Sequence, residues 1–413
     1  MTSENNLYVE KNKPEVSKNV PELRFKGFID AWELRKLSDI VVRLSKSSIN
    51  NQLPKVEFED VIAGEGRLNK DVSHKFDDRK GILFEPNNIL YGKLRPYLKN
   101  WLFADFKGIA LGDFWVFKPI NSEPKFIYCL IQSDNYQRVA NDTSGTKMPR
   151  SDWKKVSSSY FSIPRSIEEQ EKIGNLFKQL DNTITLHQRK LDKIKQLKQG
   201  YLQQLFPKND EKVPRVRFAN FDEDWEQRKL SDGMTEYTDR VFIEDDIFYK
   251  QVSVKNIGEI LLRGEQIGSK IGRKRQAKVN LDKYPITLIF TRQTVEQGGI
   301  GFAPAETNGA IVTENMPTIS ININVFNKQF LTSLFKTIMF RKNVILPNIE
   351  GGTAQIAIHE DDVLCSELLI PSIDEQKLIG LFFENLDHLI TLHQSKLDKL
   401  NSLKQALLQK LFV

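Results

Sequence analysis

Hydrophobic positions recur at alternating spacings of three and four residues along residues 169–206, and the same pattern returns along residues 375–412. This spacing places the hydrophobic side chains on one stripe of an α-helix and is typical of the a and d positions of a coiled coil. Each helix should be roughly 55 Å long at 1.5 Å per residue. The predicted seam consists of Ile173, Phe177, Leu180, Ile184, Leu191 and Ile194, and of Ile379, Phe383, Leu386, Ile390, Leu397 and Leu400.

The two segments are copies of each other. Aligned without a gap, 23 of 38 positions are identical, and the polar interruptions recur, with His187 matching His393 and Lys198 matching Lys404. Because polar seam residues fix the register and partner of a coiled coil, we predict that the two helices pair with each other. A metal site is not expected at the histidines, since neither has a Cys or a second His three or four residues away.

A second repeated segment precedes each half of the chain. Residues 20–39 and 213–232 are identical at twelve of 20 positions. A proline-led extended entry followed by a short helix is predicted for each copy, with Trp32 or Trp225 packing inward. The chain is therefore predicted to contain two similar units, each opened by this segment and closed by a long helix.

The middle parts of the two units, residues 40–163 and 233–370, hardly resemble one another in sequence. Both indicate a mixed α/β module, in which short β segments precede a helical stretch, a Gly-Thr turn and a strand ending at a proline. The Gly-Thr turns begin near Ser144 and Gly351. They permit two interpretations: an anion-binding or base-contacting loop that carries Lys147 or Gln355, or a simple chain reversal.

Composition indicates a globular protein of two to four domains, with 413 residues and 40% hydrophobic residues. No hydrophobic run approaches the length of a membrane span, and the polar first 19 residues contain no signal-peptide core, so we expect a disordered tail and a cytoplasmic location. Cys129 and Cys365 are expected to be reduced thiols.

The net charge of +6 is weak evidence for a nucleic-acid partner, but its distribution is more informative. Residues 263–278 hold six basic residues and one acidic residue, and residues 91–101 combine three basic residues with three aromatic residues and no acid. Basic residues interleaved with glycine and aromatic residues suit a surface that contacts phosphates. A solvated loop, or a strand edge guarded by lysines, would explain either window taken alone.

No catalytic constellation is found. The sequence contains no GxxxxGK[ST], no GxGxxG after a strand and no HExxH, and its five histidines are scattered. Residues 359–362 suggest a capped turn more strongly than a divalent-ion site, and Asp245, Asp246 and Lys250 resemble a nuclease set only faintly. We expect no catalysis by this chain.

The repeated Trp-Glu-x-Arg-Lys-Leu-Ser-Asp segments, the repeated long helices and the Gly-Thr turn of each module resemble the specificity (S) subunit of type I restriction-modification systems. The resemblance covers nearly the whole chain after the tail. It implies an α+β fold in which two α/β target recognition domains are separated by two long conserved helices that form an antiparallel coiled coil, with an internal pseudo-twofold repeat. The implied domains are a disordered tail 1–19, target recognition domains 20–163 and 213–370, a central helix and linker 164–212 and a C-terminal helix 371–413.

The resemblance also implies the function. Such a subunit is non-catalytic and reads a bipartite, asymmetric double-stranded DNA site. Its implied partners are two adenine methyltransferase (M) subunits that bind S-adenosylmethionine and up to two restriction (R) subunits that use ATP and Mg, so that this chain needs no cofactor or metal of its own. From residue type and loop position we predict the DNA contacts Lys93, Arg95, Tyr97, Lys99, Thr146, Lys147 and Arg150, and Arg273, Lys274, Arg275, Thr291, Arg292, Gln293, Thr353 and Gln355.

Two other classes of protein remain possible at this point. A protein-only scaffold would need no basic loops, whereas a stand-alone nuclease would cleave DNA with a metal and no other subunit. A methylation pattern that follows the identity of residues 40–163 would separate the specificity subunit from both.

Overall fold

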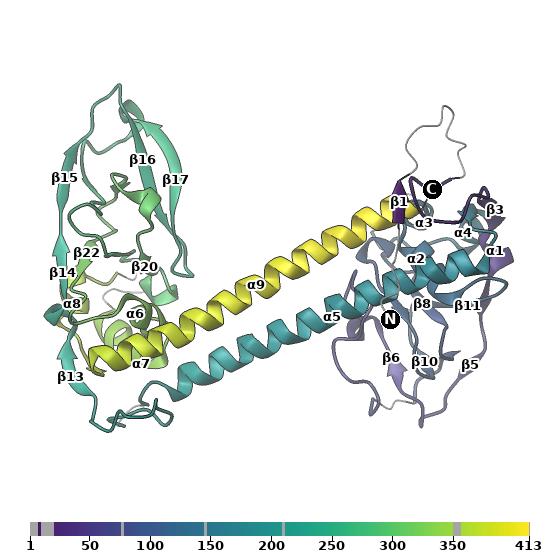
Figure 1. The fold of residues 1–413 in the computed structure, drawn as a ribbon, viewed down its shortest axis with the longest axis horizontal. Helices are drawn as coiled ribbons and strands as arrows, with labels where there is room; N and C mark the ends of the chain where they lie inside the picture. The colour runs from purple at the N-terminus through teal and green to yellow at the C-terminus, as the bar shows by residue number, and fades with distance from the viewer. Residues whose placement is uncertain are drawn as a thin grey trace. The chain divides into compact units, whose positions relative to one another are not determined.

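The chain forms two compact units, residues 1–188 with 395–413 and residues 189–394. The structure is a computed structural model that describes residues 7–9, 20–75, 78–143, 147–208, 211–349 and 357–412. Each unit contains one of the divergent middle modules and a part of both long helices (Figure 1).

The two long helices, α5 (Ile167–Gln204) and α9 (Ile373–Leu411), pack together as predicted. In the first unit Lys404 Nζ lies 2.7 Å from Asp181 Oδ1, and in the second unit Lys198 forms an ion pair with Asp387. Residue numbers rise on one helix as they fall on the other, so the pairing is antiparallel. Asp181 and Lys198 are separated by seventeen residues, as are Asp387 and Lys404, so both ion pairs belong to one register.

Each long helix begins at a serine cap that follows a proline. Ser166 Oγ accepts a hydrogen bond from Glu169 N at 3.4 Å, and Ser372 Oγ accepts one from Glu375 N at the same distance. A serine oxygen satisfies one of the N–H groups that have no partner within the first turn. The helices therefore start two residues before the repeated segments 169–206 and 375–412.

The glutamate and glutamine that follow each cap attach the module to the helix. Glu169 receives two hydrogen bonds from Arg24, at 2.7 and 2.8 Å, and Glu375 receives two from Arg217, both at 2.8 Å. Both carboxylates are buried, so the paired arginine compensates a charge that would otherwise be costly to bury. These pairs fix the repeated opening segment to the helix in both units.

The neighbouring glutamines hold the helix of each module by its main chain. Gln170 Oε1 accepts a hydrogen bond from Glu123 N, and Gln376 Oε1 accepts one from Asn327 N, both at 2.9 Å. Glu123 and Asn327 are the N-cap residues of α2 (Pro124–Gln132) and α6 (Lys328–Leu334). Because the contact is made to main-chain N–H groups, it does not depend on which side chains the module carries.

The prediction of a short helix around the repeated tryptophans is wrong. Residues 33–36 form strand β3 (Glu33–Lys36), which pairs with β12 (Tyr160–Ile163), and β13 (Glu226–Lys229) pairs with β23 (Glu367–Ile370). The pairing partner lies more than 120 residues away, so its hydrogen bonds override the local pattern. Trp32 and Trp225 are buried, as predicted. Helix α1 (Leu37–Ile40) and the 3-10 turn η3 (Leu230–Asp232) follow these strands.

The first module contains two four-stranded sheets. The first has the order β4-β11-β8-β9 and consists of β4 (Val41–Leu44), β11 (Phe114–Pro119), β8 (Ile89–Gly92) and β9 (Trp101–Phe103), all antiparallel. The second has the order β5-β7-β10-β6 and consists of β5 (Ser47–Ser48), β7 (Gly81–Phe84), β10 (Gly108–Ala110) and β6 (Lys55–Val56). Helices α2, α3 (Asp134–Ala140) and α4 (Trp153–Ser158) complete the module, and β1 (Leu7–Val9) pairs with β2 (Leu23–Phe25).

The second module repeats the first sheet and enlarges the second. Its antiparallel sheet β14-β22-β19-β20 consists of β14 (Met234–Tyr237), β22 (Thr318–Ile321), β19 (Thr287–Phe290) and β20 (Ile300–Phe302). Its five-stranded sheet β15-β18-β21-β16-β17 consists of β15 (Asp239–Phe242), β18 (Arg275–Lys278), β21 (Ile311–Val312), β16 (Phe248–Val254) and β17 (Ile260–Ile267). Helices α6, α7 (Ile338–Phe340) and α8 (Glu360–Cys365) pack beside them.

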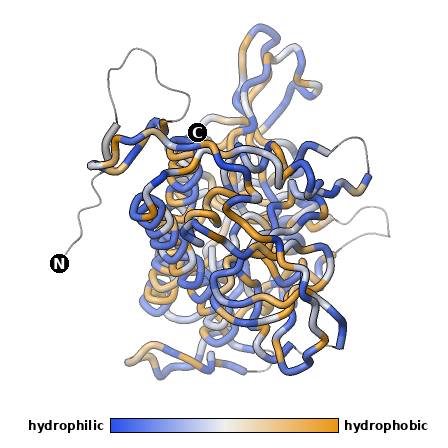
Figure 2. Tube along the Cα trace, turned by 90° about the vertical axis from the view of Figure 1, so that its right-hand side faces the viewer, coloured by the Kyte–Doolittle hydropathy of each residue, from blue (hydrophilic) through white to orange (hydrophobic). Residues whose placement is uncertain are grey.

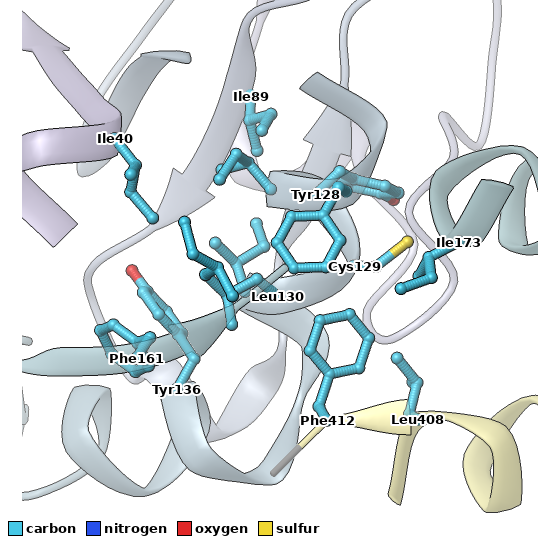
Figure 3. Packing of buried hydrophobic residues seen from close by; sticks show 14 of the residues in the cluster. Ile40, Ile89, Tyr128, Cys129, Leu130, Tyr136, Phe161, Ile173, Leu408 and Phe412 are labelled. Atoms are coloured by element: carbon cyan, nitrogen blue, oxygen red, sulfur yellow. The ribbon is translucent and has the colours of Figure 1, made fainter. Parts of the chain in front are cut away.

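The long helices contribute directly to the hydrophobic cores. In the first unit Ile173 of α5 and Leu408 and Phe412 from the C-terminal end of the chain lie around Cys129 of α2 (Figure 3). The rings of Phe126 and Phe412 stack with their centroids 5.4 Å apart. Burial raises the pKa of the Cys129 thiol strongly, so this cysteine acts as a small hydrophobic residue. Cys129 and Cys365 are both free thiols.

Hydrophobic and hydrophilic residues alternate over short distances throughout the described chain (Figure 2). None of the helices in the described residues combines the length and the hydrophobicity that crossing a membrane requires.

Candidate nucleic-acid interface

The first sheets of the two modules can be superimposed residue by residue from their hydrogen-bonded registers. Val41 and Met234 occupy the same place after the repeated opening segments. In the first module Val41 pairs with Pro119, and Phe117, two residues earlier on the same strand, pairs with Ile89. In the second module Met234 pairs with Ile321, and Ile319, again two residues earlier, pairs with Leu288. Lys93 and Arg292 each lie four residues beyond the last of these pairs. The two modules therefore place a basic residue at the same position, just past the end of the third strand.

In the first unit the main chain of Lys93 is held on both sides. Its N–H donates to Asp113 O and its carbonyl accepts from Ser151 N, both at 2.9 Å. The Asp113 carboxylate receives the Lys93 ammonium at 3.4 Å and the Arg150 guanidinium at 3.1 Å. The segment before α4, residues 147–151, is thereby brought beside the end of β8.

In the second unit Arg292 is held in the same way. Its N–H donates to Asn315 O at 3.0 Å and its carbonyl accepts from Ile358 N at 3.1 Å. Asn315 and Ile358 occupy the places of Asp113 and Ser151 in the first unit. The guanidinium forms two hydrogen bonds with the Glu360 carboxylate, of which the one from Nε measures 2.7 Å. The side chain is less than one-quarter exposed.

Most of the contacts predicted for the first module lie on this surface. Arg95 and Lys99 flank the 3-10 turn η2 (Pro96–Leu98), and both have left-handed backbone conformations. Arg95 N donates to Pro149 O at 2.7 Å, which joins the turn to residues 147–150. Arg95, Tyr97, Lys99, Lys147 and Arg150 are exposed. The predicted contact Thr146 lies outside the described residues.

The contacts predicted for the second module do not all lie in one place. Arg275 and Arg292 line one hollow of about 420 Å³, together with Arg240, Glu236, Gln276 and Glu314. Arg273 forms an ion pair with Glu314, and Lys274 bonds Asp245 and the carbonyl of Gly268. Thr291 bonds Thr294 within the chain, and Gln293 is exposed. Thr353 and Gln355 lie outside the described residues, as do the Gly-Thr turns at residues 144–146 and 351–353.

Electrostatics keep the two carboxylates that hold the basic residues ionised. Burial alone would raise the pKa of Asp113, but Arg150 and Lys93 lower it overall. Burial also acts against Glu360, and its hydrogen bonds with Arg292 again lower the pKa overall. Glu236, at the edge of the hollow, has a raised pKa because it is partly buried and lies near Glu360 and Asp361.

Three residues of these surfaces were not predicted from the sequence. Arg240 is a single arginine in an alternating strand, and its relation to Arg275 depends on the pairing of β15 with β18. Asp113 and Glu360 were not among the predicted contacts, which were chosen from basic, amide, hydroxyl and aromatic side chains. A search for acids placed close to predicted strand ends would have selected Asp113 but not Glu360, which comes from a helix 68 residues from its partner.

The predicted seam residues are all buried or half-buried. Those less than one-tenth exposed are Ile173, Phe177, Leu180, Leu191, Ile379, Phe383, Leu386 and Leu397, and the half-buried ones are Ile184, Ile194, Ile390 and Leu400. Several pack into module cores as well as along the partner helix, as Phe177 does beside Phe412 at 6.4 Å between ring centroids.

No group of three or more His, Cys, Asp or Glu side chains in the described residues is arranged to hold a metal ion. Asp245 is paired with Lys274, and Glu360 is paired with Arg292.

Comparison with protein families gives one match that covers most of the chain. Residues 29–196 and 222–402 each match the model described as the type I restriction modification DNA specificity domain. The two matches correspond to the two repeated halves and include both modules and most of both long helices.

Relatives and solved structures agree with this match. The type I restriction enzyme MjaVIII specificity subunit of Methanocaldococcus jannaschii is 23% identical over 293 residues, which span 66% of this chain and 66% of that protein. The putative MjaX specificity subunit of the same organism is 19% identical, over 70% of this chain and 67% of that protein. The crystal structure of a type I S subunit from M. genitalium superimposes with a TM-score of 0.60 at 13% identity, covering 95% of this chain and 99% of that one. A structure from work on complex assembly and conformational transition of a type I R-M system gives a TM-score of 0.50 at 16% identity, covering 91% and 96%.

Proposed function

We propose that this chain, which belongs to the family of type I restriction-modification DNA specificity subunits, reads a bipartite, asymmetric DNA site, one half with each module. The observation that carries the proposal is the equivalent placement of Lys93 and Arg292 at the end of the same strand in both units. A basic residue at one topological position, in modules that otherwise share little sequence, is best explained by a common task.

The differences around this position support an asymmetric site. In the first module the surrounding groups are Arg95, Tyr97 and Lys99 on an exposed turn and Lys147 on the segment that is bonded to this turn. In the second module Arg240 and Arg275 line a hollow beside Arg292. Arginine and lysine pair with guanine edges or phosphates, and an exposed aromatic ring can contact sugars and bases. Unlike surfaces of this kind would select unlike half-sites.

The long helices are proposed to set the separation of the two half-sites. A helix of 38 residues is about 57 Å long at 1.5 Å per residue, which exceeds one turn of DNA. The shared register of the Asp181–Lys404 and Lys198–Asp387 ion pairs supports a fixed, non-sliding pair of helices. The domain boundaries expected from the sequence belong to the same proposal.

The partners are proposed to be two adenine methyltransferase subunits and up to two restriction subunits, in the cytoplasm. S-adenosylmethionine would be held by the former, and ATP and Mg by the latter. Repeat-equivalent leucines support two similar docking surfaces: Leu186 and Leu392 are 53% and 55% exposed, and Leu197 and Leu403 are 47% and 48% exposed. Exposed leucines on a helix are typical of a surface that a protein partner covers.

Mapping of methylated adenines tests the proposal. The chain is co-expressed with its methyltransferase subunit in cells without other adenine methylation, and the genome is sequenced for modified bases. We expect one split motif. Exchange of residues 40–163 for those of another specificity subunit should change one half of the motif and leave the other half intact.

Single substitutions provide a finer test in the same assay. Lys93→Ala should relax or abolish one half of the motif and Arg292→Ala the other, since a lost base contact costs about 1 to 3 kcal/mol of discrimination. Lys255→Ala, which removes an exposed cation paired with Glu259, serves as the control and should leave the motif unchanged. A motif indifferent to the exchange of residues 40–163 would contradict the proposal, and DNA cleavage by the chain alone would favour a nuclease.

A further inference from the structure

The basic residues at the two strand ends share a feature beyond their position, because each of them is paired with an acidic residue. Lys93 rests on Asp113 at 3.4 Å, and Arg292 rests on Glu360 at 2.7 Å. A cation that is to bind DNA must first leave such a partner or share it. The carboxylates therefore lie where they can influence binding without contacting DNA.

The acids come from different elements in the two units. Asp113 precedes the central strand β11, and the residue at its place in the second unit is Asn315, which carries no charge. Glu360 is the first residue of α8, and the residue at its place in the first unit is Trp153, the first residue of α4. The cation is thus paired with an acid in both units, but the acids come from positions that are not equivalent in the repeat. Simple inheritance from the duplicated ancestor does not explain it.

We propose that Asp113 and Glu360 are positioning residues for DNA specificity: each holds the strand-end cation in the free subunit and yields it fully only to a matching half-site. A non-matching duplex offers phosphates but lacks the base contacts that would offset the loss of the ion pair. The acids therefore lower the affinity for non-matching DNA more than the affinity for the correct site. The inference rests on the proposed function and deepens it.

The geometry sets a difference between the two units. Asp113 holds two cations, Lys93 and Arg150, and the Arg150 side chain is 54% exposed. Glu360 holds one cation, through two hydrogen bonds, and both partners are mostly buried. Exposed ion pairs are exchanged more readily than buried bidentate ones. Neutralising Asp113 should release two cations to phosphate, whereas neutralising Glu360 should release one.

Binding of DNA to the full chain assembled with its methyltransferase subunits tests the inference. One duplex carries the motif found by methylation mapping and the other a scrambled sequence, and both are titrated at several salt concentrations. Asp113→Asn and Glu360→Gln should bind the scrambled duplex about three- to tenfold more tightly, with little change on the matched duplex. The dependence of log affinity on log salt should steepen by about two for Asp113→Asn and about one for Glu360→Gln.

Matched controls separate this effect from a general change of charge. Glu85→Gln and Glu259→Gln remove the acids of the exposed pairs with Lys107 and Lys255, which lie in other loops, and should leave the ratio of the two affinities unchanged. Asp113→Glu and Glu360→Asp keep the charge and should restore much of the wild-type ratio.

The sign of the change distinguishes the alternatives. If the acids only stabilise the structure around them, Asp113→Asn and Glu360→Gln will weaken binding to both duplexes or lower the melting temperature alone, which would overturn the inference. A discriminating wild type with unchanged variants would also overturn it and leave the proposed function standing. A wild-type complex that bound both duplexes equally would overturn the proposed function and the inference together.

Discussion

The two ion pairs between the long helices, Asp181–Lys404 and Asp387–Lys198, are related by the repeat, but they differ in burial. Lys404 is 7% exposed where it meets Asp181, whereas Lys198 is 14% exposed and its partner Asp387 is 46% exposed. The cost of removing one partner depends on how far the remaining charge is excluded from water. Equivalent residues should therefore respond unequally to the same substitution.

Asp181→Ala should lower the free energy of unfolding by about 3 kcal/mol, because it leaves the Lys404 ammonium buried without its partner. Asp387→Ala, the substitution at the equivalent position, should cost less, because the Lys198 ammonium that remains is more exposed than that of Lys404. Urea denaturation of the full chain measures both changes. Asp181→Leu combined with Lys404→Met should recover most of the loss, and equal effects of the two alanine variants would show that burial does not govern these pairs.

At the scale of elements, each module is attached to its long helix where the main chains of two helices come close together. Gly174 of α5 lies against the start of α2, where an added Cβ would stand 2.7 Å from Lys125 Cβ and 2.9 Å from Phe126 N. Gly380 of α9 lies in the same way against Asn327 and Phe330 N of α6. Glycine is therefore required at these crossings by the neighbouring backbone, although it is a poor helix former.

Gly174→Ala should destabilise the first unit by about 1 to 3 kcal/mol, because the neighbouring main chain has to move. Gly200→Ala is the control on the same helix, since an added Cβ there meets nothing within 4 Å. This second variant should gain up to about 1 kcal/mol from the higher helix propensity of alanine. Thermal melting followed by circular dichroism compares the two, and a stabilised Gly174→Ala variant would contradict the close packing.

At the scale of the whole molecule, the proposed spacing role makes a prediction about the DNA motif. Deletion of residues 189–195 together with 390–396 removes one heptad from each helix and keeps the register of the flanking ion pairs. The helices would shorten by about 10 Å, which corresponds to about three base pairs. The two halves of the methylated motif should persist with a spacer shorter by about that number.

Deletion of residues 189–195 alone is the control for this experiment. It shifts one helix against the other, so that Asp181 and Lys198 no longer face their partners together, and methylation should be lost. Methylation mapping measures both variants. An unchanged spacer after the paired deletion would show that the helices do not set the distance between the half-sites.

The family, that of type I restriction-modification DNA specificity subunits, and the fold class were predicted from the sequence; the family match confirms the first and the fold confirms the second. Both follow from local patterns, because the heptads of residues 169–206 and 375–412 and the repeated opening segments can be read from neighbouring residues. The pairing of the two long helices was predicted for the same reason, because matching interruptions such as Lys198 and Lys404 recur at a fixed interval.

Only the tertiary structure determined which groups that are distant in sequence lie close together. Residues 33–36 became a strand because hydrogen bonds from residues 160–163 outweigh their local preference. The equivalence of Lys93 and Arg292 follows from strand registers, since their surroundings share no motif. The acids that hold them come from a strand edge in one unit and a helix in the other. Local pattern fixes periodicity and type of element, whereas long-range pairing determines which charges meet.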